Sequence, residues 1–130
     1  MKGIVIGIDF DGTVVSHEYP EIGEDIGAVP VLKKLVDNDC LLVLNTMRGK
    51  RNGTLQAAQS WFKDNDIPLY GINENPGQKK WTDSTKAYCN IYIDDAALGC
   101  PVKLHKNGRR CVDWKRVELM LLEMGIIKAE

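Results

Sequence analysis

Four short runs of apolar residues, rich in β-branched side chains, predict the strands of a buried sheet. They cover residues 4–8, 40–44, 67–72 and 91–93. Apolar runs that do not alternate with polar residues are typical of strands covered on both faces, as in parallel sheets. A fifth run, at residues 102–105, predicts a further strand.

Apolar residues recur at helical spacing in three segments that lie between or after these strands. The segments are residues 28–36, 54–65 and 114–124, with Thr54 and Asp113 as the expected N-caps of the second and third helices. Strands that alternate with helices favour an α/β fold with a parallel sheet. The sequence therefore predicts a Rossmann-like three-layer fold, with residues 1–130 as a single domain.

The composition is that of an ordinary soluble domain and excludes several functional classes. The chain has 130 residues, 44% of them hydrophobic and 27% charged, and its formal net charge is −1. The chain therefore has no excess of basic residues of the kind that binds nucleic acids or membrane surfaces non-specifically. The 4 cysteines form no CxxC pair, so zinc-site spacing is absent. We expect reduced thiols and a cytoplasmic location.

Polar side chains follow the expected strands at the points where these strands end. Parallel strands align their carboxyl ends at one edge of a sheet, where ligands bind in such folds. We therefore expect groups that are far apart in the sequence to converge there. The expected cluster comprises Asp9 and Asp11 after the first strand, Thr46 after the second, Asp94 and Asp95 after the fourth, and Lys86 just before the fourth.

The chemistry of this cluster fits phosphoryl transfer. Asp9 could attack phosphorus and form an aspartyl-phosphate, while Asp11 could protonate the leaving oxygen and then activate water. Several carboxylates at one edge repel each other and a phosphate, and Mg²⁺ resolves this repulsion. Thr46 and Lys86 would hold the remaining phosphoryl oxygens by hydrogen bonding and charge. Gly12 would let the chain turn away close to the phosphate.

The ordered set DFDGT at residues 9–13, Thr46, Lys86 and Asp94-Asp95 resembles the haloacid dehalogenase (HAD) superfamily of phosphohydrolases. The resemblance implies that Asp9 is the nucleophile and Asp11 the general acid and base. It also implies that Mg²⁺ is bound by the Asp9 carboxylate, the Asp11 carbonyl and Asp94, with Asp95 in support. The fourth strand should then lie beside the first. Dehalogenases lack the second acid, so the resemblance favours hydrolysis of a phosphate monoester.

The chain departs from most members of that superfamily because it has no room for a cap domain. A domain needs about 50 residues or more, and core elements already occupy the gaps between the motifs. The chain is similar to small capless bacterial and phage hydrolases that share its TMR, PLYGIN and YIDD stretches. Substrate selection should then come from loops or from a neighbouring subunit of a homo-oligomer. The expected partner is a phosphorylated small molecule or nucleic-acid end.

Several assignments stay open at the level of the sequence. Lys79 and Lys80 compete with Lys86 as the phosphate lysine. Arg48 belongs to a small basic cluster beside Thr46, which either is a solvated loop or contacts a second phosphate. Two other functions remain: a receiver-like domain that accepts a phosphoryl group, and a non-catalytic protein that binds phosphate and Mg²⁺. Sugar phosphates, nucleotides and nucleic-acid ends are all candidate substrates.

Overall fold

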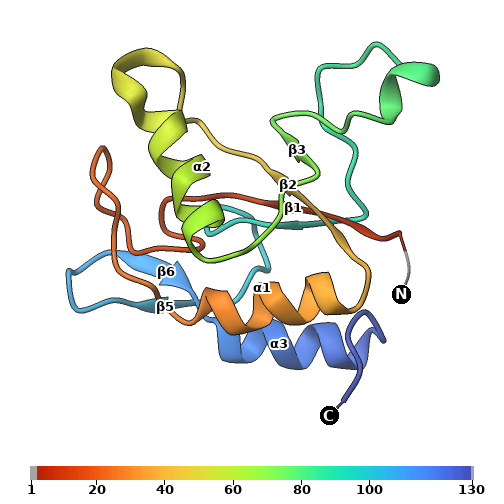
Figure 1. Ribbon diagram of the computed structural model, residues 1–130. Helices are drawn as coiled ribbons and strands as arrows, with labels where there is room; N and C mark the ends of the chain where they lie inside the picture. Colours follow the sequence, from red (N-terminus) through yellow and green to blue (C-terminus); the bar gives the residue numbers. More distant parts are fainter. Residues whose placement is uncertain (1–2, 130) are drawn as a thin grey trace.

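The computed structural model of the chain describes residues 3–129. A parallel sheet lies at its centre, with helices packed against it and a small hairpin beside it (Figure 1). The elements are, in order, β1 Val5–Ile8, α1 Ala28–Asp37, β2 Leu41–Leu44, η1 Arg51–Gly53, α2 Thr54–Asp64, β3 Gly71–Ile72, η2 Gln78–Lys80, β4 Ile91–Ile93, β5 Val102–Leu104, β6 Arg110–Val112 and α3 Trp114–Glu123.

The central sheet has the strand order β3-β2-β1-β4, and each neighbouring pair is parallel. The four residues of β1 are all buried, which explains the continuous apolar run in the sequence. Ile8 of β1 lies opposite Leu44 of β2 and Ile93 of β4. The α/β fold and the position of the fourth strand beside the first are therefore confirmed.

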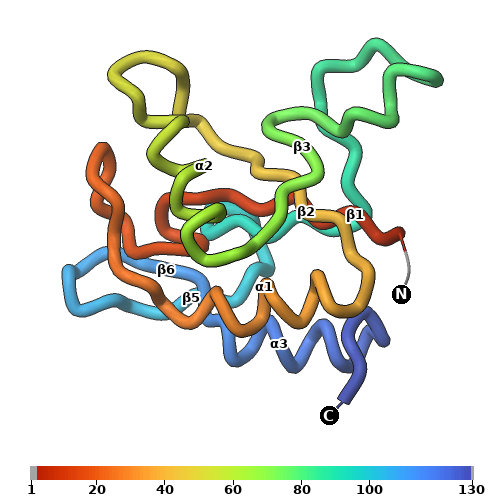
Figure 2. The backbone as a smooth tube through the Cα atoms, in the orientation of Figure 1, coloured from red at the N-terminus to blue at the C-terminus, as the bar shows by residue number. Residues whose placement is uncertain are grey.

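The two faces of the sheet are covered differently. Ile6 and Ile8 point to one face and join the main core formed with the helices, where α1 and α3 run side by side (Figure 1). On the other face, Val5 and Val43 pack in a smaller cluster against Ala87 and Cys89. The segment that supplies this second cover, residues 73–90, contains one short 3₁₀ turn and projects away from the sheet (Figure 2). The layer on this face is consequently thin.

The expected strand at residues 102–105 does not extend the parallel sheet. Instead, β5 pairs with β6 in a separate antiparallel hairpin. Residues 110–112, which form β6, were not anticipated as a strand. Thr54 is also not the N-cap of α2: Gly53 occupies that position, and the Thr54 hydroxyl donates to the Gly49 carbonyl at 3.0 Å.

The C-terminal part of the chain fastens the loop that follows β1. The Val112 N–H donates to the Gly12 carbonyl at 2.9 Å, and the indole Nε1 of Trp114 donates to the Thr13 carbonyl at 2.6 Å. Trp114 and Thr13 are both almost fully buried. Asp113 caps α3 as expected, because its carboxylate accepts from the Arg116 N–H at 3.3 Å. This end of the chain thus positions the loop that carries Asp11.

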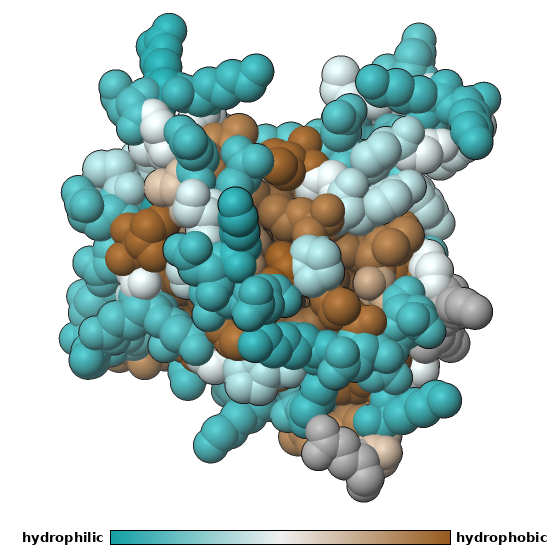
Figure 3. Space-filling view, viewed as in Figure 1, coloured by the Kyte–Doolittle hydropathy of each residue, from teal (hydrophilic) through white to brown (hydrophobic). Residues whose placement is uncertain are grey.

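The surface carries an apolar hollow beside α2. Apolar side chains are visible in a hollow of about 520 Å³ between α2 and β3, lined in part by Phe62, Ile67 and Leu69 (Figure 3). No disulfide joins the four cysteines, all of which lie within residues 3–129. Among those residues, no helix is both long enough and apolar enough to cross a membrane.

The hydrogen bond from Trp114 gives a first prediction. Trp114→Phe keeps an aromatic ring but leaves the buried Thr13 carbonyl without its partner, which should lower the free energy of unfolding by about 1–3 kcal/mol. Urea unfolding followed by far-UV circular dichroism measures this loss. Trp81→Phe is the control, since Trp81 is 64% exposed, and it should change stability by less than about 0.5 kcal/mol. Equal unfolding midpoints for the two variants would contradict the prediction.

Candidate functional site

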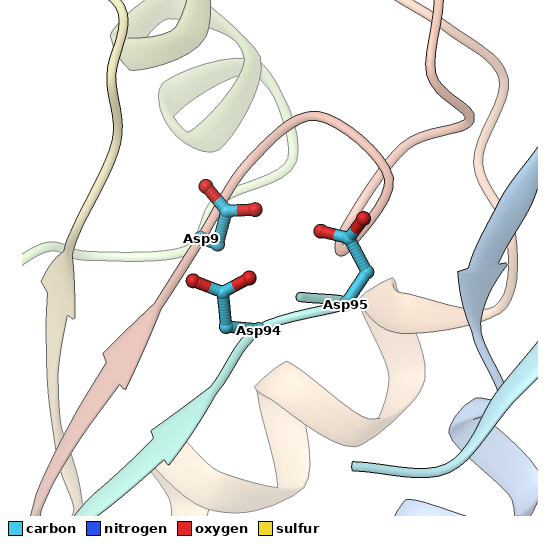
Figure 4. Close-up of side chains that lie close together, drawn as sticks. All are labelled: Asp9, Asp94 and Asp95. Carbon is cyan, nitrogen blue, oxygen red and sulfur yellow. The ribbon is translucent and has the colours of Figure 1, made fainter. Parts of the chain in front are cut away.

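Three carboxylates meet at the carboxyl ends of β1 and β4. Asp9 follows β1, whereas Asp94 and Asp95 follow β4 (Figure 4). The two strands are parallel and in register, and the Asp9 N–H donates to the Ile93 carbonyl at 3.0 Å. One oxygen from each carboxylate lies within 4.8 Å of the others. The convergence expected from strand direction is therefore present for these side chains.

The Asp9 carboxyl group is strongly perturbed by this setting. The pKa of Asp9 is raised from 3.8 to about 8, mainly by burial, then by its hydrogen bond with Asp95 and by the negative charges of Asp94 and Asp95. The backbone N–H of Phe10 acts in the opposite direction and favours the charged form. A hard cation among these oxygens would reverse the repulsion, because it stabilises the ionised carboxylates. The donor set of carboxylate oxygens fits Mg²⁺.

Thr13 contacts both the carboxylate that follows β1 and one that follows β4. Its hydroxyl lies 3.1 Å from Asp9 Oδ2 and 3.0 Å from Asp95 Oδ1, and it accepts from the Asp95 N–H at 3.1 Å. The single hydroxyl proton can serve one carboxylate at a time. Thr13 is fully buried. The sequence assigned it no role beyond the motif, although its place directly after Gly12 was the available signal.

Gly12 is required by the close approach of Asp95. Its φ is +79°, and a Cβ at this position would lie 2.8 Å from Asp95 Oδ2. A side chain here would therefore be strained and would also displace the carboxylate. The turn expected at Gly12 is present, and in this structure it makes room for Asp95.

Asp11 is held apart from the other three acids by Arg48. Arg48 Nε and Nη2 donate to the two carboxylate oxygens of Asp11, each at 2.8 Å. The Arg48 side chain is almost completely buried, at 2% exposure for the residue. Arg48 is therefore not part of a solvated basic loop, one of the two readings the sequence left open.

The remaining donors of Arg48 all reach backbone carbonyls. Nη1 donates to Pro20 and Thr54 at 3.2 and 3.1 Å, and Nη2 donates to Glu21 at 2.8 Å. With the two bonds to Asp11, all five N–H groups of the guanidinium are engaged. The group also lies over two aromatic rings, 5.0 Å from the centroid of Phe10 and 5.2 Å from that of Tyr19. Arg48 thus joins three segments of the chain around one charge.

A cavity of about 540 Å³ opens beside these acids. Thr46 lines it, as expected; its backbone N–H donates to Asn73 Oδ1 at 2.8 Å, and its hydroxyl accepts from the Arg48 N–H at 3.1 Å. His17 also lines the cavity, and its buried Nδ1 has no hydrogen-bond partner among the described residues. The full lining is Asp9, Asp11, His17, Tyr19, Thr46, Met47, Arg48, Asp94, Asp95 and Ala96.

Lys86 is the predicted site residue that the structure does not bring to this cavity. Its Nζ lies 5.2 Å from the centroid of the Tyr92 ring. Tyr92 pairs with Gly7 in the middle of the sheet rather than at its carboxyl edge. The reason is the direction of β4, whose start lies at the opposite edge from its end. Lys79 and Lys80 do not line the cavity either.

Tyr19 and Met47 are lining residues that the sequence did not single out. Both sit in loops, where hydrophobic periodicity does not mark them. Their positions depend on Arg48, which follows Met47 directly and contacts the Tyr19 ring. The available signal for Met47 was its place in the TMR stretch, directly after Thr46.

The fold and the site together define an α/β protein of Rossmann-like architecture, with a carboxylate cluster at the carboxyl edge of its sheet. No protein-family model matches the chain, and no curated protein matches it. A solved structure, that of a conserved protein from Bacteroides thetaiotaomicron, matches with a TM-score of 0.76 and 31% sequence identity. The match covers 95% of this chain and 93% of that one. The chain belongs to the same family as that conserved protein.

The raised pKa of Asp9 predicts how stability depends on pH in metal-free protein. The unfolded chain loses this proton near pH 3.8, but the folded chain keeps it until about pH 8. The Asp9 contribution to the free energy of unfolding is therefore complete below the lower value and is lost as pH rises through the higher one. Thermal unfolding of chelator-treated protein between these limits measures it. Asp9→Asn should show a shallower decline than the wild type, whereas Asp83→Asn, at an exposed site, should match the wild type.

The buried guanidinium gives a second prediction from this site. Arg48→Gln leaves Asp11 without its charged partner and removes donors from the carbonyls of the loop at Pro20 and Glu21 and of Thr54, the first residue of α2. We expect the free energy of unfolding to fall by roughly 3 kcal/mol, as for other buried ion pairs that lose one partner. Arg51→Gln, at an exposed position of the same basic cluster, should stay within about 0.5 kcal/mol of the wild type. Urea unfolding at pH 7 compares the two, and a similar small effect for both would count against the role given to Arg48.

Proposed function

We propose that this protein is a Mg²⁺-dependent phosphatase of the HAD type, which hydrolyses phosphate monoesters through an aspartyl-phosphate. The observation that carries the proposal is the cluster of Asp9, Asp94 and Asp95, whose oxygens lie within 4.8 Å of one another beside a cavity of about 540 Å³. The resemblance of the motifs to that superfamily supports the same reading. The shared family with the Bacteroides protein assigns no activity to this chain, so the proposal rests on these residues.

The cation would be held by the Asp9 and Asp94 carboxylates, with Asp95 beside them and the Asp11 carbonyl as the further ligand that the resemblance implies. When bound, Mg²⁺ would neutralise the crowded carboxylates and the phosphate oxygens. Asp9 would then be ionised, as a nucleophile must be. Thr13 would orient the Asp9 carboxylate through its hydroxyl, which lies 3.1 Å from Oδ2.

The reaction itself uses two carboxyl groups in turn. Asp9 forms a bond to phosphorus while the bond from phosphorus to the leaving oxygen breaks, and a proton from Asp11 goes to that oxygen. Water then attacks the aspartyl-phosphate, gives a proton to Asp11 and releases inorganic phosphate. Both Asp11 oxygens accept hydrogen bonds from Arg48 here. Each Asp11 oxygen keeps a second lone pair beside the one that Arg48 occupies, so Asp11 can carry the proton while the contact with Arg48 is kept.

The phosphate would be held without a lysine from residues 73–90. Thr46 offers a hydroxyl at the cavity wall, and that hydroxyl can still donate because Arg48 uses it only as an acceptor. The role of Lys86 stays a prediction of the sequence, with its Nζ placed over Tyr92. A cytoplasmic setting and a phosphorylated metabolite or nucleic-acid end as substrate belong to the same proposal.

Hydrolysis of p-nitrophenyl phosphate tests the proposal. We expect turnover with Mg²⁺, loss of turnover with a chelator, and recovery when Mg²⁺ is restored. Asp9→Asn should lower kcat by about a thousandfold or more, because the nucleophile is removed. Asp83→Asn, a change of the same kind at an exposed position, should retain activity.

Three results would separate the proposal from its alternatives. Equal activity of Asp9→Asn and the wild type would remove Asp9 as the nucleophile. Stable labelling by acetyl phosphate without turnover would favour a receiver-like protein that accepts a phosphoryl group. Tight binding of Mg²⁺ without turnover of any phosphate ester would favour a non-catalytic binding protein.

A further inference from the structure

The outer wall of the cavity is formed by two exposed side chains from different loops. Tyr19 is 55% exposed and Met47 is 99% exposed, yet both line the cavity that contains Asp9. Single exposed apolar side chains are common on protein surfaces. These two stand out because they share the mouth of a cavity whose inner wall carries carboxylates.

The Tyr19 ring is fixed on one side and open on the other. One face lies against the Arg48 guanidinium, 5.2 Å from the ring centroid, and Arg48 is itself held by its contact with the Phe10 ring and by five hydrogen bonds. The ring is thus oriented without a ligand. Its exposed surface can accept a flat group, and the flexible thioether of Met47 can cover such a group from the neighbouring loop.

The charges of the cavity disfavour a second anionic group. Four of its lining residues are aspartates. Arg48 is the only lysine or arginine of the lining, and all five of its N–H groups already have partners. A second phosphate of the substrate would therefore lie beside carboxylates, and the lining offers it no lysine or arginine with a free N–H group.

We propose that the cavity selects phosphate monoesters of flat, uncharged alcohols, with the ring of the leaving group against Tyr19 and Met47, and discriminates against esters that carry a second phosphate. This inference rests on the proposed phosphatase function. The step is simple hydrolysis: the bond between phosphorus and the ester oxygen breaks, water supplies the replacing oxygen, and an uncharged aromatic alcohol leaves with one proton. Aromatic or heteroaromatic monophosphates are favoured over sugar bisphosphates and nucleic-acid ends.

Two esters with matched leaving groups test the apolar wall. Benzyl alcohol and methanol are nearly equally acidic, so benzyl and methyl phosphate differ mainly in the ring. We expect kcat/KM with Mg²⁺ to favour benzyl phosphate, and the ratio of the two values to fall about threefold to tenfold in Met47→Ser and in Tyr19→Leu. The leucine keeps apolar cover over Arg48.

The matched controls change the same residue types away from the cavity. Met124→Ser and Tyr88→Leu replace residues that are 51% and 44% exposed and that do not line it. Both should keep the wild-type ratio. A third substrate, benzyl phosphate with a phosphonate on the para carbon, tests the charge argument. Its kcat/KM should be lower than that of benzyl phosphate by on the order of tenfold.

The outcomes distinguish failure of this substrate class from failure of the proposed phosphatase function. Equal kcat/KM for benzyl and methyl phosphate, ratios unchanged in both wall variants, or equal rates with and without the phosphonate would each overturn the substrate class while leaving a phosphatase. No hydrolysis of any of the three esters in the presence of Mg²⁺ would overturn the phosphatase function, and the substrate class with it.

Discussion

Mutual repulsion among the carboxylates at the carboxyl edge of the sheet is the constraint to which the surrounding structure responds. Parallel pairing of β1 with β4 forces Asp9, Asp94 and Asp95 together. The protein relieves the repulsion in several ways: a proton retained on Asp9, the Thr13 hydroxyl between two of the acids, and oxygen donors that suit a cation. Under the proposed function, the same crowding would favour a divalent cation among these oxygens.

The negative charge of Asp11 is offset separately, by its ion pair with Arg48. The guanidinium is buried, binds Asp11 in a bidentate manner and has every donor engaged. Such a group restricts the positions of the chain segments that it contacts. Here it ties the loop after β1 to the loop containing Pro20 and Glu21 and to the start of α2. The geometry of the cavity wall therefore follows from the same contact that holds Asp11, the proton carrier of the proposed reaction.

The sequence predicted what depends on strand direction and missed what depends on the path of loops. The convergence of Asp9 with Asp94 was predictable, because parallel strands that end in acids must present them at one edge. Lys86 was placed there by its position in the motif order, but residues 73–90 form a projecting segment that leaves its Nζ over Tyr92. Arg48 was visible only as part of a basic cluster, since Asp11 lies 37 positions away. The strand at β5 was predicted, but its pairing with β6 was not, because β6 has only three residues and begins with an exposed arginine, Arg110.

The hydrogen bond between Trp114 and Thr13 joins positions 101 apart in the sequence. The loop that carries the site's acids is made early during synthesis, yet the groups that fasten it come from β6 and α3, near the end of the chain. Closing so long a loop is slow compared with local folding. The loop after β1 therefore gains its final contacts only once Val112 and Trp114 have been made, so the nascent chain carries Asp9 and Asp11 before that loop can be fastened.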